Sequence, residues 1–247
     1  MDLTLYGYEG NPRTKIIRIA VKFPLQSRQI KDQKLTSHQA ALEGIPLHLS
    51  IVVPRMYINT EDYLAEFPLS RTKVPALKGP DIQITEVIAI AMYISRIHNR
   101  ANLLGDGSNK QMAEVISWVS WANQEMLSTL ASWFLPLVPG LKKPAPYNQE
   151  AVAGGKVATD DLMAKLEDAL SSKSYLVGGS VTLADLFLAM YLARGMEYVL
   201  DTEWRSNHPN IMKYFDGITQ IPQWKAVVPS MKMIDVETPN KDPYGTL

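Results

Sequence analysis

Pro75 and Glu86 are two residues of this chain whose types and positions could do chemistry together. Proline has no backbone N–H, so Pro75 is expected at the entrance of the strand predicted for residues 74–77, where a cis bond would turn neighbouring backbone outward. After a turn and a second strand at 82–85, Glu86 opens a helix and puts a carboxylate beside free N–H groups. The stretch 71–94 therefore predicts a socket for a peptide-like ligand that has both an amine and a carboxylate.

The composition excludes several other kinds of site. The 247-residue chain has no cysteine, which removes thiolate nucleophiles, disulfides and cysteine metal sites. Its four histidines are scattered, and the sequence has no metal-ligand spacing, phosphate loop or Ser-His-Asp arrangement. The formal net charge is zero, and no apolar run reaches the length of a membrane span. We therefore expect a cytoplasmic protein with no metal, no nucleic-acid partner and no membrane partner.

A family resemblance gives the socket a ligand. The letters KVPAL at 73–77, followed by TE at 85–86 and a helix predicted over 87–95, resemble the glutathione-binding half of the glutathione transferases. In that family the valine and the cis-proline bond the cysteinyl backbone of glutathione, and the acidic residue and its successor hold the γ-glutamyl end. The resemblance implies a glutathione-binding set made of Val74, Pro75, Glu86 and Val87. To this set we add Lys73 as a candidate for the glycine carboxylate and Arg13 as a candidate anion contact. Because the chain has no cysteine, the reactive sulfur has to come from the ligand.

For three residues of this set, the sequence does not determine how strongly they would bind glutathione. A carboxylate at a helix start, as at Glu86, is favourable without any ligand by a few tenths to about 1 kcal/mol. A surface lysine such as Lys73 is usually only solvated. Many relatives have serine at the position of Val87, so here the hydroxyl contact is lost and only the backbone N–H remains for a carboxylate. We expect glutathione binding that is retained but weakened.

Activation of glutathione needs a hydrogen bond that stabilises the thiolate and so lowers the pKa of the thiol. A hydroxyl or an N–H at a helix start can supply that bond, and the candidates between the first strand and the first helix are Tyr6, Tyr8, Asn11 and Arg13. We select Tyr8, which lies close to where family members place a catalytic tyrosine or serine, and keep Asn11 as a second catalytic candidate. Packing of Tyr8 at the domain interface, a plain helix cap at Asn11 and a solvated Arg13 stay open as alternatives.

Aromatic residues predict where an apolar substrate would bind. The resemblance places four of them on a helix that faces the cleft in the family: Trp118, Trp121, Trp133 and Phe134. Trp133 and Phe134 precede a proline-rich break and are the stronger candidates for the acceptor pocket. Helical spacing also fits a core role for each of the four side chains.

The second half of the chain extends the resemblance. VISWVSWA at 115–122 and YLVGGSVTLAD at 175–185 are similar to the transferase domain of the elongation factor 1B gamma subunit and its free-standing fungal relatives. The elongation factor subunit carries a further large domain, and this chain ends before one could fit, so we expect a free-standing protein. The resemblance also implies a homodimer. Thr182 and Asp185 in the second motif are expected to cap a helix.

The elements that position these residues form an α/β half followed by an all-helical half. The predicted order is a strand at 2–8, a helix at 13–20, a strand at 47–53, a helix at 60–67, and then the two strands and the helix of the socket. This is the thioredoxin-like order, with parallel and antiparallel pairs in one sheet. Long helices follow at 112–133 and 149–170. We predict a thioredoxin-like domain at 1–99, an all-helical domain at 109–235 and a polar tail, mobile or draped, at 236–247.

Residues 21–39 interrupt this pattern. They contain Pro24, have no clear period and carry four basic residues against one acidic residue. Joining Ala20 directly to Ala40 would give one continuous amphipathic helix, which is the family pattern for this region. We hypothesise that the segment is foreign to the functional fold, as a retained intron or a looped-out excursion.

Three functions are compatible with these residues. The first is transfer of glutathione to a small apolar electrophile, with a role in fungal secondary metabolism suggested by the resemblance. The second is glutathione-dependent cis-trans isomerisation, in which glutathione adds to a conjugated alkene and leaves after the bond has rotated. The third is a non-catalytic interaction scaffold, as in the elongation factor. Transfer and isomerisation require the same residues, so the sequence does not separate them.

Overall fold

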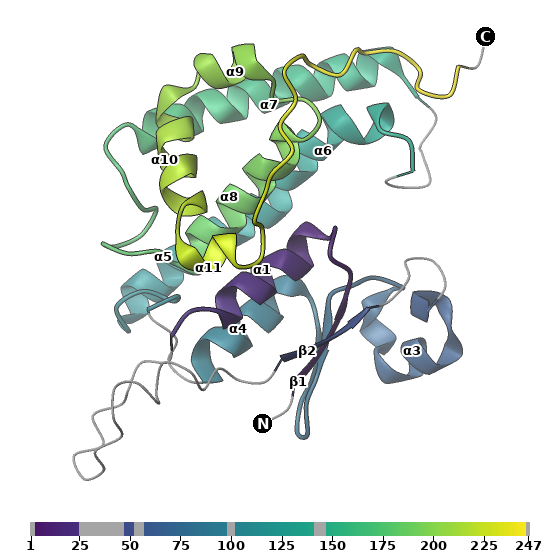
Figure 1. Ribbon diagram of the computed structural model, residues 1–247, viewed down its shortest axis with the longest axis vertical. Coiled ribbons are helices and arrows are strands. Elements are labelled where there is room, and N and C mark those ends of the chain that lie inside the picture. The colour runs from purple at the N-terminus through teal and green to yellow at the C-terminus, as the bar shows by residue number, and fades with distance from the viewer. Residues whose placement is uncertain (1–2, 25–46, 52–56, 98–101, 141–146, 246–247) are drawn as a thin grey trace. The chain divides into compact units, whose positions relative to one another are not determined.

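The computed structural model describes residues 3–24, 47–51, 57–97, 102–140 and 147–245. Contacts within it divide the chain into two compact units. The first unit comprises Met1–Met112 and Pro222–Val228, and the second comprises Ala113–Ile221 and Pro229–Leu247. In the part of the chain described, the first unit combines a sheet with helices and the second is built from helices (Figure 1). This is the predicted architecture of an α/β half and an all-α half.

A sheet of four strands, as far as the described residues go, forms the centre of the first unit. The strands are β1 (Leu3–Gly7), β2 (Leu47–Ile51), β3 (Ala76–Lys78) and β4 (Gln83–Thr85). They lie in the order β2-β1-β3-β4, and β1 is parallel to β2. The pairs β1-β3 and β3-β4 are antiparallel. Parallel and antiparallel pairs thus occur in one sheet, as the thioredoxin-like order predicts.

Helices pack on both faces of this sheet, and the alternation of side chains along β1 explains how. The described helices of this unit include α1 (Pro12–Val21), α3 (Glu61–Glu66), α4 (Val87–Ile97) and α11 (Pro222–Lys225). Leu3 and Leu5 of β1 are fully buried. The helices α1 and α4 contact each other on one face of the sheet (Figure 1). Tyr6 points to the other face, where it packs against Tyr63 and Phe67 of the α3 region.

The first helix begins where the sequence predicts and continues past the predicted end. Asn11 is the N-cap and Pro12 the first helical residue, and both are favoured at those positions. The helix includes Val21, and beyond it Phe23 of the segment 21–39 is buried, whereas Lys22 and Pro24 are exposed. The rest of that segment and the predicted helix end near Ala40 lie outside the described residues.

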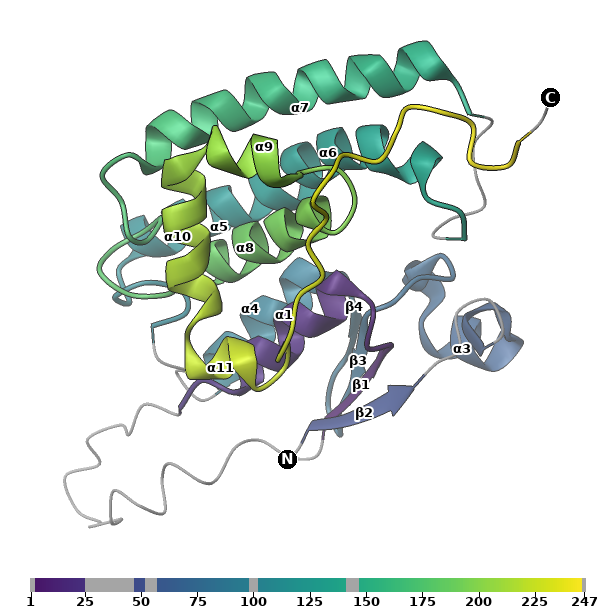
Figure 2. The ribbon, with the colours of Figure 1, turned by 45° about the horizontal axis from the view of Figure 1, so that its top comes forward.

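The first long helix predicted for the second unit is interrupted in the structure. The expected single helix over 112–133 consists of α5 (Asn109–Trp121), a π-helical segment (Ala122–Met126) and α6 (Leu127–Phe134). A π-helical turn leaves the apolar spacing on either side helical, so the hydrophobic period does not reveal it. By contrast, α7 has the predicted bounds, Gln149–Leu170, and runs along α6 (Figure 2).

A buried helix, α8 (Leu183–Met196), forms the core of this unit, and α10 (Pro209–Thr219) packs against α7 and α8. Thr182 and Asp185 form a capping box at the start of α8, which confirms the expected cap. The short α9 (Thr202–Ser206) has no counterpart in the sequence prediction. The polar tail is draped over the helices, where Glu237 pairs with Lys156 of α7 (Figure 2).

Candidate functional site

The strand pairings bring the ends of three strands together at one end of the sheet. Tyr6 pairs with Ala76, and Ala76 pairs with Thr85 on its other side. The residues that follow β1, precede β3 and follow β4 therefore meet at this end. These residues are Tyr8, the pair Val74–Pro75 and the pair Glu86–Val87. We call this region the sheet-end site.

At the sheet-end site, the peptide bond between Val74 and Pro75 is cis, as the sequence predicts. Pro75 is buried, Val74 is half-buried and Lys73 is exposed. β3 begins just after the proline, at Ala76, so Pro75 lies at the strand entrance rather than inside the ladder. The backbone of Val74 is consequently left without a ladder partner, in the position where a peptide-like ligand could pair with it.

Glu86 has an unusual backbone at the start of α4. Its φ is 70°, in the left-handed region that residues other than glycine rarely adopt. The side chain is exposed, and the carbonyl of Glu86 accepts the first helical hydrogen bond from Ile90 N at 3.0 Å. Val87 is 2% exposed, so the group it can offer a ligand is its backbone N–H. An exposed carboxylate and a helix-start N–H therefore lie side by side.

The predicted thiol-activating residues have different roles in the structure. Asn11 is almost buried, and its side-chain oxygen accepts hydrogen bonds from Arg13 N at 2.8 Å and Thr14 N at 3.2 Å. That oxygen acts as a helix cap, which favours the cap over a thiol contact. Tyr8 is half-buried, and its ring lies so near Gly10 that an added Cβ there would be 3.7 Å from it. Tyr8 therefore folds over the turn that leads into α1, and its activating role stays a prediction.

Tyr6 is another predicted candidate for thiol activation, but in the structure its side chain packs among aromatic residues near α3. Its ring stacks on Tyr57 with centroids 6.3 Å apart and meets the edges of Tyr63 and Phe67 at 6.2 Å and 5.2 Å. Burial is the main cause that raises the pKa of Tyr6 above its ordinary value. We call Tyr6, Tyr57, Tyr63 and Phe67 the aromatic cluster. It lies on the face of the sheet that carries α3.

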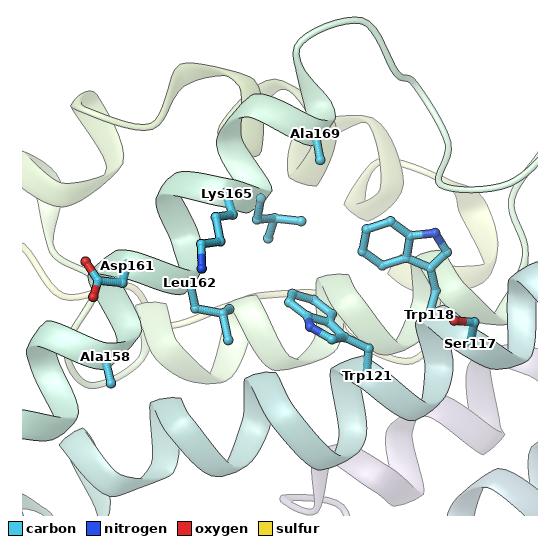
Figure 3. A pocket seen from close by; sticks show the side chains of 9 residues that line it. Ser117, Trp118, Trp121, Ala158, Asp161, Leu162, Lys165 and Ala169 are labelled. Atoms are coloured by element: carbon cyan, nitrogen blue, oxygen red, sulfur yellow. The ribbon is translucent and has the colours of Figure 1, made fainter.

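Within the helical unit, two of the four predicted pocket residues line a groove between α5 and α7. Trp118 and Trp121 meet edge to face with centroids 5.5 Å apart, and Figure 3 shows both rings facing the residues of α7. The groove has a volume of about 590 Å³ and is lined by Ser117, Trp118, Trp121, Ala158, Asp161, Leu162, Lys165, Leu166 and Ala169. Its apolar floor could hold a small hydrophobic molecule.

Trp133 and Phe134, the stronger candidates by sequence, do not line that groove. Trp133 is 1% exposed and Phe134 is 3% exposed. The ammonium of Lys156 lies 5.2 Å from the Trp133 ring centroid, and Phe134 stacks on Tyr198 at 5.3 Å. Both side chains thus pack in the helical unit, which is the core role that their spacing also allowed.

Metal sites and membrane-spanning helices are both absent from the described residues. Over that part of the chain, histidine, aspartate and glutamate side chains form no group of three or more that could hold a metal ion. Within the same residues, no helix is long and apolar enough to cross a membrane.

The chain is similar in sequence to a known protein family and to several known proteins. A family model described as the C-terminal domain of glutathione S-transferase matches residues 129–222. The glutathione S-transferase stcT of Emericella nidulans is 30% identical over 244 residues, which cover 97% of this chain and 98% of that protein. A second glutathione S-transferase of that fungus is 29% identical over 240 residues, covering 97% of this chain and 80% of its own length.

Among solved structures, the GST-like domain of elongation factor 1-gamma from Saccharomyces cerevisiae has a TM-score of 0.72 and 28% identity. The match covers 96% of this chain and 97% of that domain. Against the full elongation factor 1-gamma proteins of Saccharomyces cerevisiae and Schizosaccharomyces pombe, this chain spans about half of their length.

Proposed function

Because this chain belongs to the glutathione S-transferase family, we propose that it binds glutathione at the sheet-end site and transfers it to a small hydrophobic electrophile. The observation that carries the proposal is the strand pairing that brings the cis Val74–Pro75 bond and the exposed carboxylate of Glu86 to one end of the sheet. Similarity to fungal glutathione S-transferases over nearly the whole chain supports it.

Each part of glutathione has a matching group at this site. The backbone of Val74, which precedes the β3 ladder, bonds the cysteinyl backbone, as one further strand would. The Glu86 carboxylate pairs with the γ-glutamyl ammonium, and the Val87 N–H bonds the γ-glutamyl carboxylate at the positive end of α4. Lys73 is exposed, and its ammonium is our candidate partner for the glycine carboxylate. Arg13, in the first turn of α1, supplies a second positive charge.

The chemical step uses the thiol that the ligand brings. The glutathione S–H loses its proton to solvent, and the thiolate is stabilised by a hydrogen bond donated by the Tyr8 hydroxyl. The sulfur then forms a bond to the electrophilic carbon, and the leaving group departs with its electron pair. If the acceptor is a conjugated alkene, the adjacent carbon takes up a proton instead.

We propose the groove at Trp118 and Trp121 as the binding site for the hydrophobic acceptor. It is open, apolar and of a size that fits a small organic molecule. Trp118→Ala should then raise the KM for the acceptor and leave the KM for glutathione unchanged. An unchanged acceptor KM would remove this groove from the substrate site.

Isomerisation and scaffolding are the two alternative functions. Isomerisation would use the same residues, with glutathione released after bond rotation. The scaffold is favoured by the similarity to the GST-like domain of elongation factor 1-gamma. Product analysis separates the three after incubation of candidate acceptors with and without glutathione. A conjugate supports transfer, an unmodified geometric isomer supports isomerisation, and the absence of both together with the absence of glutathione binding supports the scaffold.

A further inference from the structure

The segment that leads into the cis proline makes a turn in an uncommon backbone conformation. Arg71 has φ 51° and Thr72 has φ 58°, and Lys73 N donates to Ser70 O at 3.0 Å. Positive φ at both central residues is the pattern of a type I′ turn, which usually contains asparagine or glycine. A β-branched residue such as Thr72 is a rare occupant of this conformation. Contacts elsewhere must therefore hold the turn in place.

One such contact comes from Tyr63 of the aromatic cluster. Its hydroxyl donates to Lys73 O at 2.6 Å, although the two residues lie ten positions apart. Tyr63 is fully buried, and the rings of Tyr57 and Phe67 lie 5.6 Å and 5.2 Å from its own. Thr60 caps α3 and accepts from Tyr63 N at 3.2 Å, which fixes the backbone as well. The packing of its ring and the hydrogen bond of its backbone thus hold the Tyr63 hydroxyl in a fixed position.

The accepting carbonyl belongs to the peptide unit whose N–H is that of Val74. Because a peptide unit is planar, fixing the direction of Lys73 O also fixes the direction of Val74 N–H. Burial raises the pKa of Tyr63 to about 12, so the hydroxyl keeps its proton and remains a donor throughout the neutral range.

We infer that Tyr63 is a positioning residue for glutathione: its hydrogen bond to Lys73 O holds the turn at Arg71 and Thr72 and aims the backbone of Val74 at the ligand. This inference rests on the proposed glutathione function. It goes beyond that function because Tyr63 lies in the aromatic cluster and is not one of the residues proposed to touch glutathione.

The test compares Tyr63→Phe with the matched control Tyr57→Phe, which removes a hydroxyl from the same cluster. Loss of one hydrogen bond should raise the KM for glutathione about three- to tenfold in Tyr63→Phe, with kcat within about twofold of the parent. Tyr57→Phe should change neither constant. An unchanged KM in Tyr63→Phe, or an equal change in both variants, would overturn the inference.

A rescue experiment separates positioning from general loss of packing. Glycine adopts positive φ readily, so Thr72→Gly lets the turn persist without its anchor. The double variant Tyr63→Phe/Thr72→Gly should therefore have a lower KM for glutathione than Tyr63→Phe alone. A KM that stays as high as in Tyr63→Phe contradicts an effect through the turn.

A ligand-free measurement keeps this inference separate from the proposed function. Hydrogen exchange at the Lys73 amide, which donates to Ser70 O and closes the turn, should become faster in Tyr63→Phe and not in Tyr57→Phe when it is followed by NMR. If the parent protein does not bind glutathione, the proposed function fails and so does the role of Tyr63 in it, whatever the exchange shows. If the parent binds glutathione and Lys73 amide exchange is the same in all three proteins, the positioning role alone fails.

Discussion

At the scale of single residues, Glu86 joins an exposed carboxylate to a left-handed backbone. A residue other than glycine in that conformation costs of order 1–3 kcal/mol, and such residues cluster at binding sites. The φ of 70° is therefore consistent with a backbone that is held for a ligand rather than for stability. The sequence predicts a binding role for this acidic residue but not its backbone conformation. That conformation depends on where β4 ends and α4 begins.

Glu86→Gln tests the proposed pairing with the γ-glutamyl ammonium. Loss of a charge-assisted hydrogen bond should weaken glutathione binding about tenfold or more, measured by isothermal titration calorimetry. Glu61→Gln is the matched control, because Glu61 is also an exposed acid at a helix start, in α3, and should bind as the parent does. Equal affinities for the parent and Glu86→Gln would remove Glu86 from the site.

Tyr8→Phe tests thiol activation at the same scale. Without the hydroxyl, the pKa of bound glutathione should rise, and kcat at neutral pH should fall about tenfold or more while the affinity for glutathione is kept. The ultraviolet absorbance of the bound thiolate, titrated against pH, reports the shift. If turnover and the titration curve stay as in the parent, another group activates the thiol.

At the scale of elements, sequence patterns predict what depends on local spacing and miss what depends on tertiary contact. The bounds of α7 follow from its apolar period, and the start of α1 follows from Asn11 and Pro12. The hydrogen bond from Tyr63 to Lys73 O joins two elements across a loop, so no local pattern reports it. The burial of Trp133 depends in the same way on α7, whose Gly155 lets the two helices approach closely.

The start of α8 gives a prediction on stability. Asp185 is fully buried and accepts hydrogen bonds from Leu176 N, Thr182 N and the Tyr214 hydroxyl at 2.7–2.8 Å. Asp185→Ala leaves these donors without a partner and should lower the free energy of unfolding by about 3 kcal/mol or more. Urea denaturation measures this, with the exposed Asp168→Ala of α7 as the control. A loss no larger than in the control would mean that the cap carries little of the stability.

The pH dependence at Asp185 has a definite sign. Burial raises the pKa of this carboxyl, so the folded state favours the protonated form. The stability that this preference contributes is fully present below the ordinary carboxyl pKa and is lost as the pH rises through the raised pKa. Relative to Asp185→Asn, the parent should therefore lose unfolding free energy as the pH increases through that interval. An unfolding free energy of the parent that rises with pH relative to that of Asp185→Asn would contradict the raised pKa.

At the scale of the whole molecule, the family resemblance implies a homodimer in the cytoplasm, and both stay predictions. Multi-angle light scattering after size exclusion should give twice the mass of one chain, and the mass of a single chain would contradict the dimer. Fractionation of cells should recover the protein with cytoplasmic markers. The residues outside the described ranges include most of the segment 21–39, and sequencing of the transcript decides whether that segment is encoded in the mature message.

Glutathione binding at the sheet-end site underlies every role proposed for Val74, Glu86, Tyr8 and Tyr63. Titration of the parent protein with glutathione, followed residue by residue through amide NMR shifts, tests it directly. Binding at the sheet-end site should give saturable shifts at Val74, Glu86 and Val87, with smaller shifts at Tyr8. Shifts confined to the helical unit, or no saturable shift at any of these amides, would contradict it.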